Sequence, residues 1–383
     1  MNKRIFCLPL SLLFIVTGIV SAQNKSAGIN LSVWKGIRTQ PADSAQTTYF
    51  NLGILSTMNR LNGVGFNAFG SVIGGNMNGI QFSGLANMVG ESMRGVQLSG
   101  ISNINGNNMV GLSATGLVNI AGNQSKGVLL SGMTSISGDN TSGVMASGIM
   151  NISGDGASGV HLAGLANITG ATFNGVTAGG LLNVIGEHLN GVQISGFANI
   201  VASRMNGVQI GLGNYATKAK GVQIGLVNYY KNEMKGFQLG LVNANPDTKV
   251  QMLIFGGNAT KINIGARSKN KLFYTIIGAG THYLDFSDKF SATLFYRGGI
   301  WLPLCKDLTI SGDLGYQHIE TFKNKDYGIP ARLYGLQARL NLEYQITKKF
   351  GIFASGGYGG SRYYNKDITY DKGVIAEAGI VLF

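Results

Sequence analysis

The sequence predicts an all-β fold in which a repeat β-solenoid is followed by an antiparallel β-barrel. The first observation is a glycine-led phrase that returns every 16 residues from Gly63 to Gly207, and then after 14 and 15 residues at Gly221 and Gly236. The second is a change near residue 247, where the phrase stops and long segments of alternating apolar and polar residues begin. A helix is excluded over the repeat, because each glycine costs about 1 kcal/mol in a helix interior.

The first 22 residues have the pattern of a secretory signal peptide. Lys3 and Arg4 precede an apolar run that ends at Val20, and a small-residue cleavage site follows. A membrane-spanning helix is the alternative, but the run is short and ends in small residues. Removal of the signal takes Cys7 away and leaves Cys305 as the single thiol, so no internal disulfide is expected.

Residues 23–62 are expected to form a cap of short strands, over residues 29–34 and 48–55. Residues 63–246 carry the repeat. One unit reads Gly-Val-Gln-Leu-Ser-Gly-Leu-Ala-Asn-Ile-x-Gly and is followed by four variable residues. Val and Leu alternate with Gln, which is strand periodicity. A fixed period sustained this long predicts a repeat architecture, here two short strands with glycine corners in each coil. Twelve coils about 4.8 Å apart would form a rod of roughly 55–60 Å.

An asparagine holds the same place in most coils, among apolar residues. We predict that these side chains form a structural ladder, because stacked amides hydrogen-bond to one another and to corner backbone groups. A ligand-binding row is the alternative. The ladder residues are Asn87, Asn103, Asn119, Asn151, Asn167, Asn183 and Asn199.

A glutamine column occupies the other face of the first strand, which the alternation predicts to be exposed. This column is the candidate recognition face for a surface glycan or a protein ligand, and the alternative is a solvated polar stripe. Its members are Gln81, Gln97, Gln193 and Gln209, with Gln223 and Gln238 in the last units.

The last repeats resemble those of a known family. The phrases Gly-Val-Gln-Ile-Gly-Leu-Val-Asn, which begins at Gly221, and Gly-Phe-Gln-Leu-Gly-Leu-Val-Asn, which begins at Gly236, are similar to the GxQxGLxN repeats of bacterial surface-repeat proteins. The resemblance covers residues 63–243. It implies an exported, surface-associated protein and transfers no catalytic residue, because the family is defined mainly by its repeats.

Residues 247–383 contain eight alternating segments with one apolar and one polar face. This pattern is typical of transmembrane β-strands, and a soluble antiparallel barrel or sandwich is the alternative. Eight strands form the smallest closed transmembrane barrel, whose interior is filled by side chains such as Arg339 and Glu343, so an anchor is expected and not a pore. The segments are residues 250–257, 261–267, 272–280, 290–301, 307–318, 331–346, 350–363 and 372–383.

The chain ends on Phe383 after an alternating segment, which resembles the C-terminal strand of small outer-membrane β-barrels. Because aromatic side chains gather at membrane interfaces, interface positions are expected at Trp301, Tyr344 and Phe383. Glu377 shares the parity of Phe383 and breaks a strictly lipid-facing set. One large barrel built from all the repeats is an alternative topology. Such barrels alternate short and long turns, however, whereas a single turn type recurs here.

No catalytic pattern stands out. The four histidines are scattered without zinc-ligand spacing, and paired carboxylates are nearly absent from the repeats. We therefore predict no enzyme activity, cofactor or metal. The 30 Lys and Arg residues outnumber 17 Asp and Glu but form no compact patch, which favours outer-membrane lipids over nucleic acid as partners. The expected function is structural or adhesive, at the outer membrane and cell surface. An exported glycan-binding or glycan-processing protein is the alternative.

Overall fold

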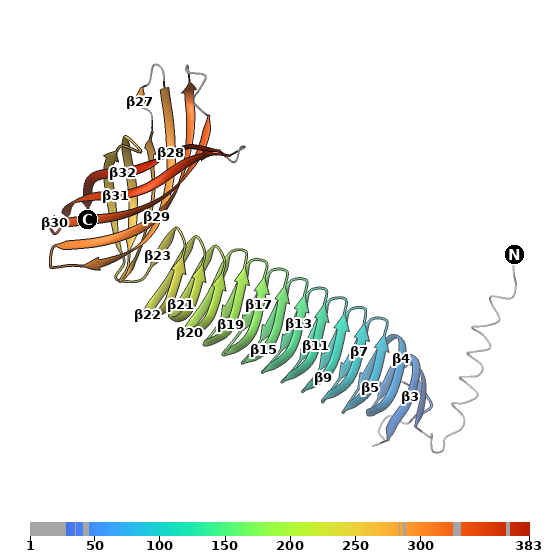
Figure 1. The fold of residues 1–383 in the computed structure, drawn as a ribbon. Coiled ribbons are helices and arrows are strands. Elements are labelled where there is room, and N and C mark those ends of the chain that lie inside the picture. Colours follow the sequence, from blue (N-terminus) through green and yellow to red (C-terminus); the bar gives the residue numbers. More distant parts are fainter. Residues whose placement is uncertain are drawn as a thin grey trace, which may run out of the picture. The chain divides into compact units, whose positions relative to one another are not determined.

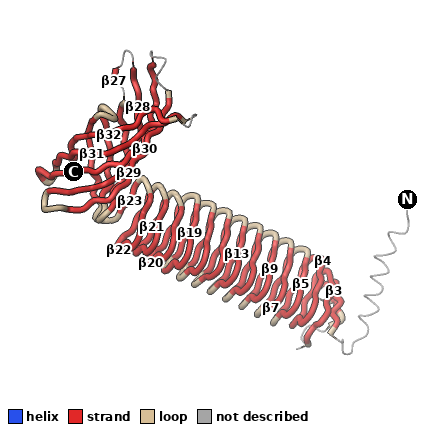
Figure 2. The backbone as a smooth tube through the Cα atoms, in the orientation of Figure 1, coloured by secondary structure: helices blue, strands red, loops and turns tan. Residues whose placement is uncertain are grey.

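The computed structural model describes residues 28–34, 36–40, 46–282, 284–285, 289–324, 331–364 and 368–383. The predicted signal peptide lies outside these residues. Every described element is a strand, as Figure 2 shows, and no helix suited to crossing a membrane occurs in the described part of the chain. The chain forms two compact units, residues 1–211 with 215–221, and residues 212–214 with 222–383.

The parallel winding begins before the first predicted repeat. β1 (Ile29–Trp34) pairs in parallel with β3 (Thr47–Met58), and β3 pairs in parallel with β4 (Arg60–Ile73). β2 (Ile37–Arg38) folds back antiparallel to β1. The residues predicted to form a cap therefore include strands that already wind in the same sense as the coils.

From β5 to β19, each coil consists of a longer and a shorter strand, and neighbouring coils pair in parallel (Figure 1). The register joins each residue to the one 16 positions later, as in Gly95 with Gly111 and Asn103 with Asn119. The strands are β5 (Met77–Ser83), β6 (Ala86–Val89), β7 (Met93–Ser99), β8 (Ser102–Asn105), β9 (Met109–Thr115), β10 (Val118–Ala121), β11 (Ser125–Ser131), β12 (Thr134–Ser137), β13 (Thr141–Ser147), β14 (Met150–Ser153), β15 (Ala157–Ala163), β16 (Ala166–Thr169), β17 (Phe173–Gly179), β18 (Leu182–Ile185) and β19 (His188–Ser195).

The last coils use longer strands that run through the corner, β20 (Ala198–Ile210), β21 (Gly213–Ile224) and β22 (Val227–Leu239), followed by β23 (Val242–Ala244). The result is a β-solenoid of about 12 turns. The alternative of one large barrel built from the repeats is wrong, because neighbouring strands of an up-and-down barrel are antiparallel.

The head glycine of each coil is required by the backbone. Gly111 has a φ of +128°, a region that L side chains rarely adopt, and a Cβ there would overlap the carbonyl oxygen of Gly95 in the preceding coil. Gly95 stands in the same relation to Gly79. The repeated glycine therefore allows consecutive coils to approach closely at this point of the longer strand.

The predicted alternation along the longer strand is present, but its sense is reversed. The glutamines point into the solenoid and are fully buried, whereas the Val and Leu positions beside them face outward, so the predicted exposure of the column is wrong. In-register stacking explains how the amides can be buried: Gln97 Nε2 donates to Gln81 Oε1 (3.2 Å), and Gln209 Nε2 donates to Gln193 Oε1 (2.9 Å). The apolar part of the interior includes Met77, Met93, Met109, Leu129 and Met145.

The C-terminal region is a closed antiparallel barrel of eight strands. The first and last strands pair with each other, for example Leu253 with Val381, and this pairing closes the wall. All eight predicted segments fall on these strands. They are β24 (Lys249–Gly257), β25 (Ile262–Lys269), β26 (Phe273–Thr281), β28 (Lys289–Pro303), β29 (Leu308–Asn324), β30 (Arg332–Thr347), β31 (Phe350–Tyr363) and β32 (Thr369–Leu382); the two-residue β27 (Leu284–Asp285) extends the pairing of β28.

Candidate functional site

The barrel wall has apolar side chains outside and polar side chains inside. On β30, Leu336 and Leu340 are 61% and 66% exposed, whereas Gln337 and Arg339 between and beside them are buried. Leu314 on the neighbouring β29 is 72% exposed. This order is the reverse of that in a water-soluble barrel. Other exposed apolar wall residues include Val250, Ile262, Ile264, Ile277, Leu294, Ile300, Leu342 and Val374.

Two buried bidentate ion pairs cross the barrel interior. Arg267 on β25 donates from Nη1 and Nη2 to the Glu343 carboxylate of β30, at 2.6 and 3.0 Å. Arg297 on β28 donates in the same way to Glu377 of β32, at 2.9 and 3.1 Å. Two parallel N–H···O bonds give each pair a fixed geometry. The sequence analysis placed Arg339 and Glu343 inside but did not find these pairings, since the partners lie far apart in the chain.

A third guanidinium, that of Arg339, extends the Arg297–Glu377 pair to Asp313. Arg339 Nε lies 3.2 Å from Glu377, and its Nη1 lies 3.7 Å from Asp313. Asp313 also accepts hydrogen bonds from the Tyr274 hydroxyl and from Asn341 Nδ2, both at 2.8 Å. Three arginines thus face three carboxylates. The interior charge is balanced, as buried ions require.

A cluster of apolar side chains fills another part of the barrel interior. It contains Leu253, Phe255, Tyr274, Ile276, Phe295, Phe353 and Val381, and Trp301 and Phe383 pack against it. The Arg297 guanidinium lies over the Phe255 ring at 4.6 Å and so links the apolar cluster to the charged one. The interior is therefore filled by side chains, as expected for the smallest barrels.

The predicted interface aromatics lie in different environments. Tyr344 faces outward near the end of β30 and is 49% exposed. Trp301 and Phe383 instead pack against the interior cluster, so an outward interface position is wrong for them. Trp301 Nε1 donates to the Asn270 carbonyl at 2.7 Å. The parity of Phe383 belongs to the inner face of β32, which explains why Glu377 shares it.

The last coil of the solenoid packs against the outside of the barrel wall. Within this compact unit, outward-facing Thr275 and Tyr296 donate to the carbonyls of Leu241 and Gly240, at 2.9 and 2.6 Å. Near the end of β25, Ser268 Oγ donates to the Asn243 carbonyl at 3.1 Å. These bonds attach the coil to β25, β26 and β28. The side chains that form them belong to the outward-facing rows of these strands, which carry exposed apolar residues elsewhere on the wall.

The asparagine ladder runs through the solenoid interior. Asn151 Nδ2 donates to Asn167 Oδ1, Asn167 to Asn183, and Asn183 to Asn199, at 2.8, 2.9 and 3.0 Å. Each amide also donates to a backbone carbonyl, as Asn167 does to Ala178 at 2.8 Å. Asn87 donates to Asn103 in the same manner. The hydrogen bonds of these amides hold neighbouring coils together. The amides are therefore not available to bind a ligand, which argues against the alternative of a ligand-binding row.

The ladder is interrupted by hydroxyl groups. Ser113 Oγ accepts from Asn103 Nδ2 at 3.0 Å and donates to Asn119 Oδ1 at 2.7 Å. Where Ser135 replaces asparagine, its hydroxyl lies 2.9 Å from that of Ser131, which in turn lies 2.9 Å from Ser147 Oγ. Hydroxyls thus carry the hydrogen-bond chain across the coils that lack the amide.

The glutamine column contains a histidine that the sequence analysis did not single out. His161 stands directly between Met145 and Thr177 of the adjacent coils and is buried. Its ring lies edge-on to Phe173 with centroids 5.0 Å apart. Burial lowers the pKa of His161 to about 4, so the imidazole is neutral at pH 7. The sequence could have indicated this placement, because His161 holds the same position in the 16-residue period as the glutamines.

The outer surface of the solenoid carries four columns of apolar side chains, which we call the apolar flank. Two columns lie on the longer strand, one at the glycine corner and one on the shorter strand. They are Val64, Ile80, Val96, Leu112, Val128, Val144, Val160, Val176, Val192 and Val208; Phe66, Phe82, Leu98, Ala114, Leu130, Ala146, Leu162, Ala178, Ile194 and Ile210; Phe69, Leu85, Ile101, Leu117, Met133, Ile149, Leu165, Leu181 and Phe197; and Val72, Met88, Ile104, Ile120, Ile136, Ile152, Ile168, Val184 and Ile200.

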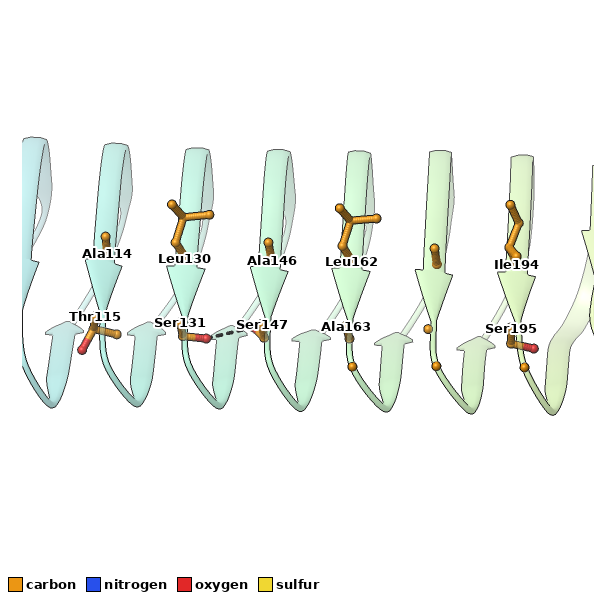
Figure 3. A pocket seen from close by; sticks show the side chains of 15 residues that line it. Ala114, Thr115, Leu130, Ser131, Ala146, Ser147, Leu162, Ala163, Ile194 and Ser195 are labelled. Carbon is orange, nitrogen blue, oxygen red and sulfur yellow. Dashed lines mark hydrogen bonds between the residues drawn. The ribbon is translucent and has the colours of Figure 1, made fainter.

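A shallow groove of about 860 Å³ runs along this flank. Figure 3 shows its construction: Leu130, Leu162 and Ile194 project from alternate coils, and the shorter Ala146 leaves room between Leu130 and Leu162. The lining is almost entirely aliphatic side chain and glycine backbone, with a few hydroxyls at its margin. Nothing in it resembles a catalytic constellation, and the part of the chain that the structure describes contains no cluster of three or more His, Cys, Asp or Glu able to hold a metal ion.

The charged residues of the same coils gather on one edge. Between residues 63 and 211, every Asp, Glu, Lys and Arg falls on four consecutive positions of the 16-residue period. The sequence analysis missed this charged edge because it followed the glycines and amides and not the charges. The residues are Glu91, Arg94, Lys126, Asp139, Asp155, Glu187 and Arg204.

Comparisons with known proteins add little to this geometry. No protein-family model and no curated protein matches the chain. Among solved structures, the crystal structure of Ail, the attachment invasion locus protein of Yersinia pestis, aligns with 35% of this chain and 91% of that chain, at 13% sequence identity and a TM-score of 0.20. At a TM-score this low the likeness carries no argument about this chain.

Proposed function

We propose that this chain is an outer-membrane protein whose barrel is an anchor embedded in lipid. The observation that carries the proposal is the polarity of the barrel wall, with leucines outside and an arginine–carboxylate cluster inside. In water, such a wall would expose far more contiguous apolar surface than soluble monomers normally do. In a bilayer, the same wall has its apolar face in hydrocarbon and all its backbone groups paired within a closed sheet.

The solenoid is proposed to be a structural element without catalytic activity, and an adhesive role would require its coils to lie outside the cell. Its conspicuous polar side chains are buried and hydrogen-bonded along the asparagine and glutamine columns. They support the fold and are not presented to a substrate. A glycan-recognition role built on the glutamine column loses its basis, since those amides point inward.

The anchor is tested by refolding the full chain from urea into phospholipid vesicles. We expect a folded form that migrates faster on gels without heating and requires lipid or detergent to form. Leu340→Arg places a charge at the middle of β30 on the outer face and should lower folding stability by about 2–4 kcal/mol. Leu304→Arg, at the exposed turn between β28 and β29, is the matched control and should cost at most about 1 kcal/mol.

A chain that folds and stays monomeric in buffer without detergent would contradict the proposal. So would equal effects of the two arginine substitutions, because a water-soluble barrel has no hydrocarbon depth to distinguish them.

A further inference from the structure

The apolar flank of the solenoid is not accounted for by the anchor. Its four columns contain no charged, hydroxyl or amide side chain over at least nine coils, although these side chains face outward. Soluble proteins rarely expose contiguous apolar surface of this extent, and where they do it marks an interaction surface.

The charge distribution indicates which kind of partner suits this surface. Interfaces between proteins retain hydrogen-bonding groups, about one bond per 100–200 Å², and are roughly 56–65% apolar. The flank offers no such groups in its columns. The charged edge carries three basic and four acidic residues, so no excess of one sign draws in a polyanion. An apolar face opposed by a charged edge is the arrangement of elements that lie in a membrane interface.

The contact between the last coil and the barrel wall also favours a membrane as the partner of the flank. The last coil covers outward-facing Thr275 and Tyr296, so this coil stands beside the wall that the proposed anchor turns toward lipid. On the same coil, Phe237 packs against Phe273 of β26 with ring centroids 5.7 Å apart. Leu239 and Val242 of this coil remain exposed beside the wall. Because this coil packs on a wall that the proposed anchor turns toward lipid, the exposed apolar residues of the coil lie at the depth of the lipid.

We propose that the apolar flank binds the acyl chains of a phospholipid bilayer, with the charged edge in water. This inference rests on the proposed anchor, since continuity with the barrel wall is part of its support. The groove between Leu130, Leu162 and Ile194 is where acyl chains would pack most closely, because the intervening alanines leave room for methylene groups. The solenoid is then a membrane-associated element along its length, and not a free rod.

The test uses the full chain in a Cys305→Ser background with one cysteine at a time. Leu130→Cys reports on the apolar flank, Asn123→Cys on the charged edge, and Leu340→Cys on the barrel wall. Each is labelled with an environment-sensitive fluorophore and reconstituted into phosphatidylcholine–phosphatidylglycerol vesicles that contain lipids with nitroxide quenchers on their acyl chains. We expect quenching at the flank to be comparable to that at the wall and at least about threefold greater than at the edge.

The outcomes separate this inference from the anchor. Quenching at Leu340→Cys with none at Leu130→Cys overturns the lipid-binding flank and leaves the anchor standing. No quenching at either position removes the anchor, and this inference with it. If Leu130→Cys escapes quenching and a short bifunctional maleimide joins two chains through it, a second copy covers the flank and the inference is wrong.

Discussion

At the residue scale, His161 shows how the surroundings of one buried position in the solenoid determine the charge state of its side chain. Its column carries paired glutamines in more distant coils, but the neighbours of His161 itself are Met145 and Thr177, which give an imidazole no such partner. Its Nε2 is buried without a hydrogen bond. The neutral ring is stabilised by packing against Phe173, and the charged ring has nothing to compensate its burial.

Acidification should therefore destabilise the solenoid through this one side chain. The folded-state pKa of about 4 lies below the unfolded value of 6.5, so the stability contribution is full above pH 6.5 and is lost as the pH falls toward 4. The loss amounts to about 3 kcal/mol, at about 1.4 kcal/mol per pKa unit. Denaturant unfolding of the full chain in detergent at pH 7, 6, 5 and 4.5, followed by circular dichroism, measures it.

His161→Met, which copies the neighbouring Met145, is the matched variant. It should be more stable than the natural chain at pH 4.5 and show a shallower pH dependence. Parallel pH profiles for the two chains would mean that His161 does not titrate as its burial implies.

Glycine positions also make a prediction at this scale. Gly111→Ala should destabilise the solenoid by about 1–3 kcal/mol from backbone strain alone, with a further loss from overlap with the preceding coil. Gly74→Ala is the control, because its φ is ordinary and the nearest atom to a new Cβ is Asn59 Oδ1 at 3.7 Å. Thermal unfolding of the two variants should rank Gly111→Ala well below Gly74→Ala, and equal midpoints would contradict the packing role of the head glycine.

At the scale of the element, the period of the repeat was readable from sequence but the direction of its faces was not. Alternation predicts that Gln97 and Leu98 lie on opposite faces of one strand, but it does not predict which face points into the solenoid. The usual rule puts leucine in the core. Here in-register stacking lets buried glutamines hydrogen-bond to one another, and the head glycines allow tight coils, so the amides lie inside and the leucines outside.

The barrel strands were predictable in number and parity, because each is long and strictly alternating. The pairing of Arg297 with Glu377 was not, since it joins β28 to β32 across the interior and depends on the barrel's stagger. Phe383 was misplaced for a related reason: aromatic residues at strand ends occur on both faces, and only Glu377 in the same row indicated the inner one.

Removal of one buried carboxylate gives a prediction for this element. Glu377→Ala leaves the guanidiniums of Arg297 and Arg339 without their shared partner and should destabilise the barrel by about 3–5 kcal/mol. Glu320→Ala removes an exposed ion pair with Arg332 and should leave stability unchanged. Urea titration of the folded gel band in vesicles compares them, and an unaffected Glu377→Ala would show that the cluster tolerates unpaired charge.

At the scale of the whole molecule, the predicted boundary at residue 247 follows the change of sequence pattern. The second compact unit instead begins near residue 222 and includes the last coils. The reason lies in hydrogen bonds such as those of Thr275 and Tyr296, which connect residues tens of positions apart. A change in local periodicity locates the change of architecture and gives no information about which coil packs on which wall.

For the proposed outer-membrane anchor, the two ends of the barrel predict its orientation. The connections after β25, β28 and β30 are short, whereas at the other end those after β26, β29 and β31 are longer and the one after β24 is as short as the one after β28; β24 starts at the short-turn end. Outer-membrane barrels place short turns in the periplasm. The exposed Cys305 lies in one of these short turns, so a membrane-impermeant maleimide should leave it unlabelled on intact cells and label it after permeabilisation.

A matched variant tests the opposite end. Ala331→Cys in a Cys305→Ser background lies in the longer connection between β29 and β30 and should react on intact cells. Labelling of Cys305 on intact cells would instead place the coils that precede β24 outside the cell.

The constant step of 16 residues has a genetic consequence. Each coil presents to its successor the same edge that it received from its predecessor, so loss or duplication of one whole unit rejoins surfaces that already match. A frame-preserving deletion within a strand shifts the amides, glycines and leucines of its coil out of their columns, whereas the stacked 14- and 15-residue units at the end of the solenoid show that a shortened turn keeps them aligned. Loss or gain of whole units therefore offers this gene a route to shorter and longer proteins that still fold.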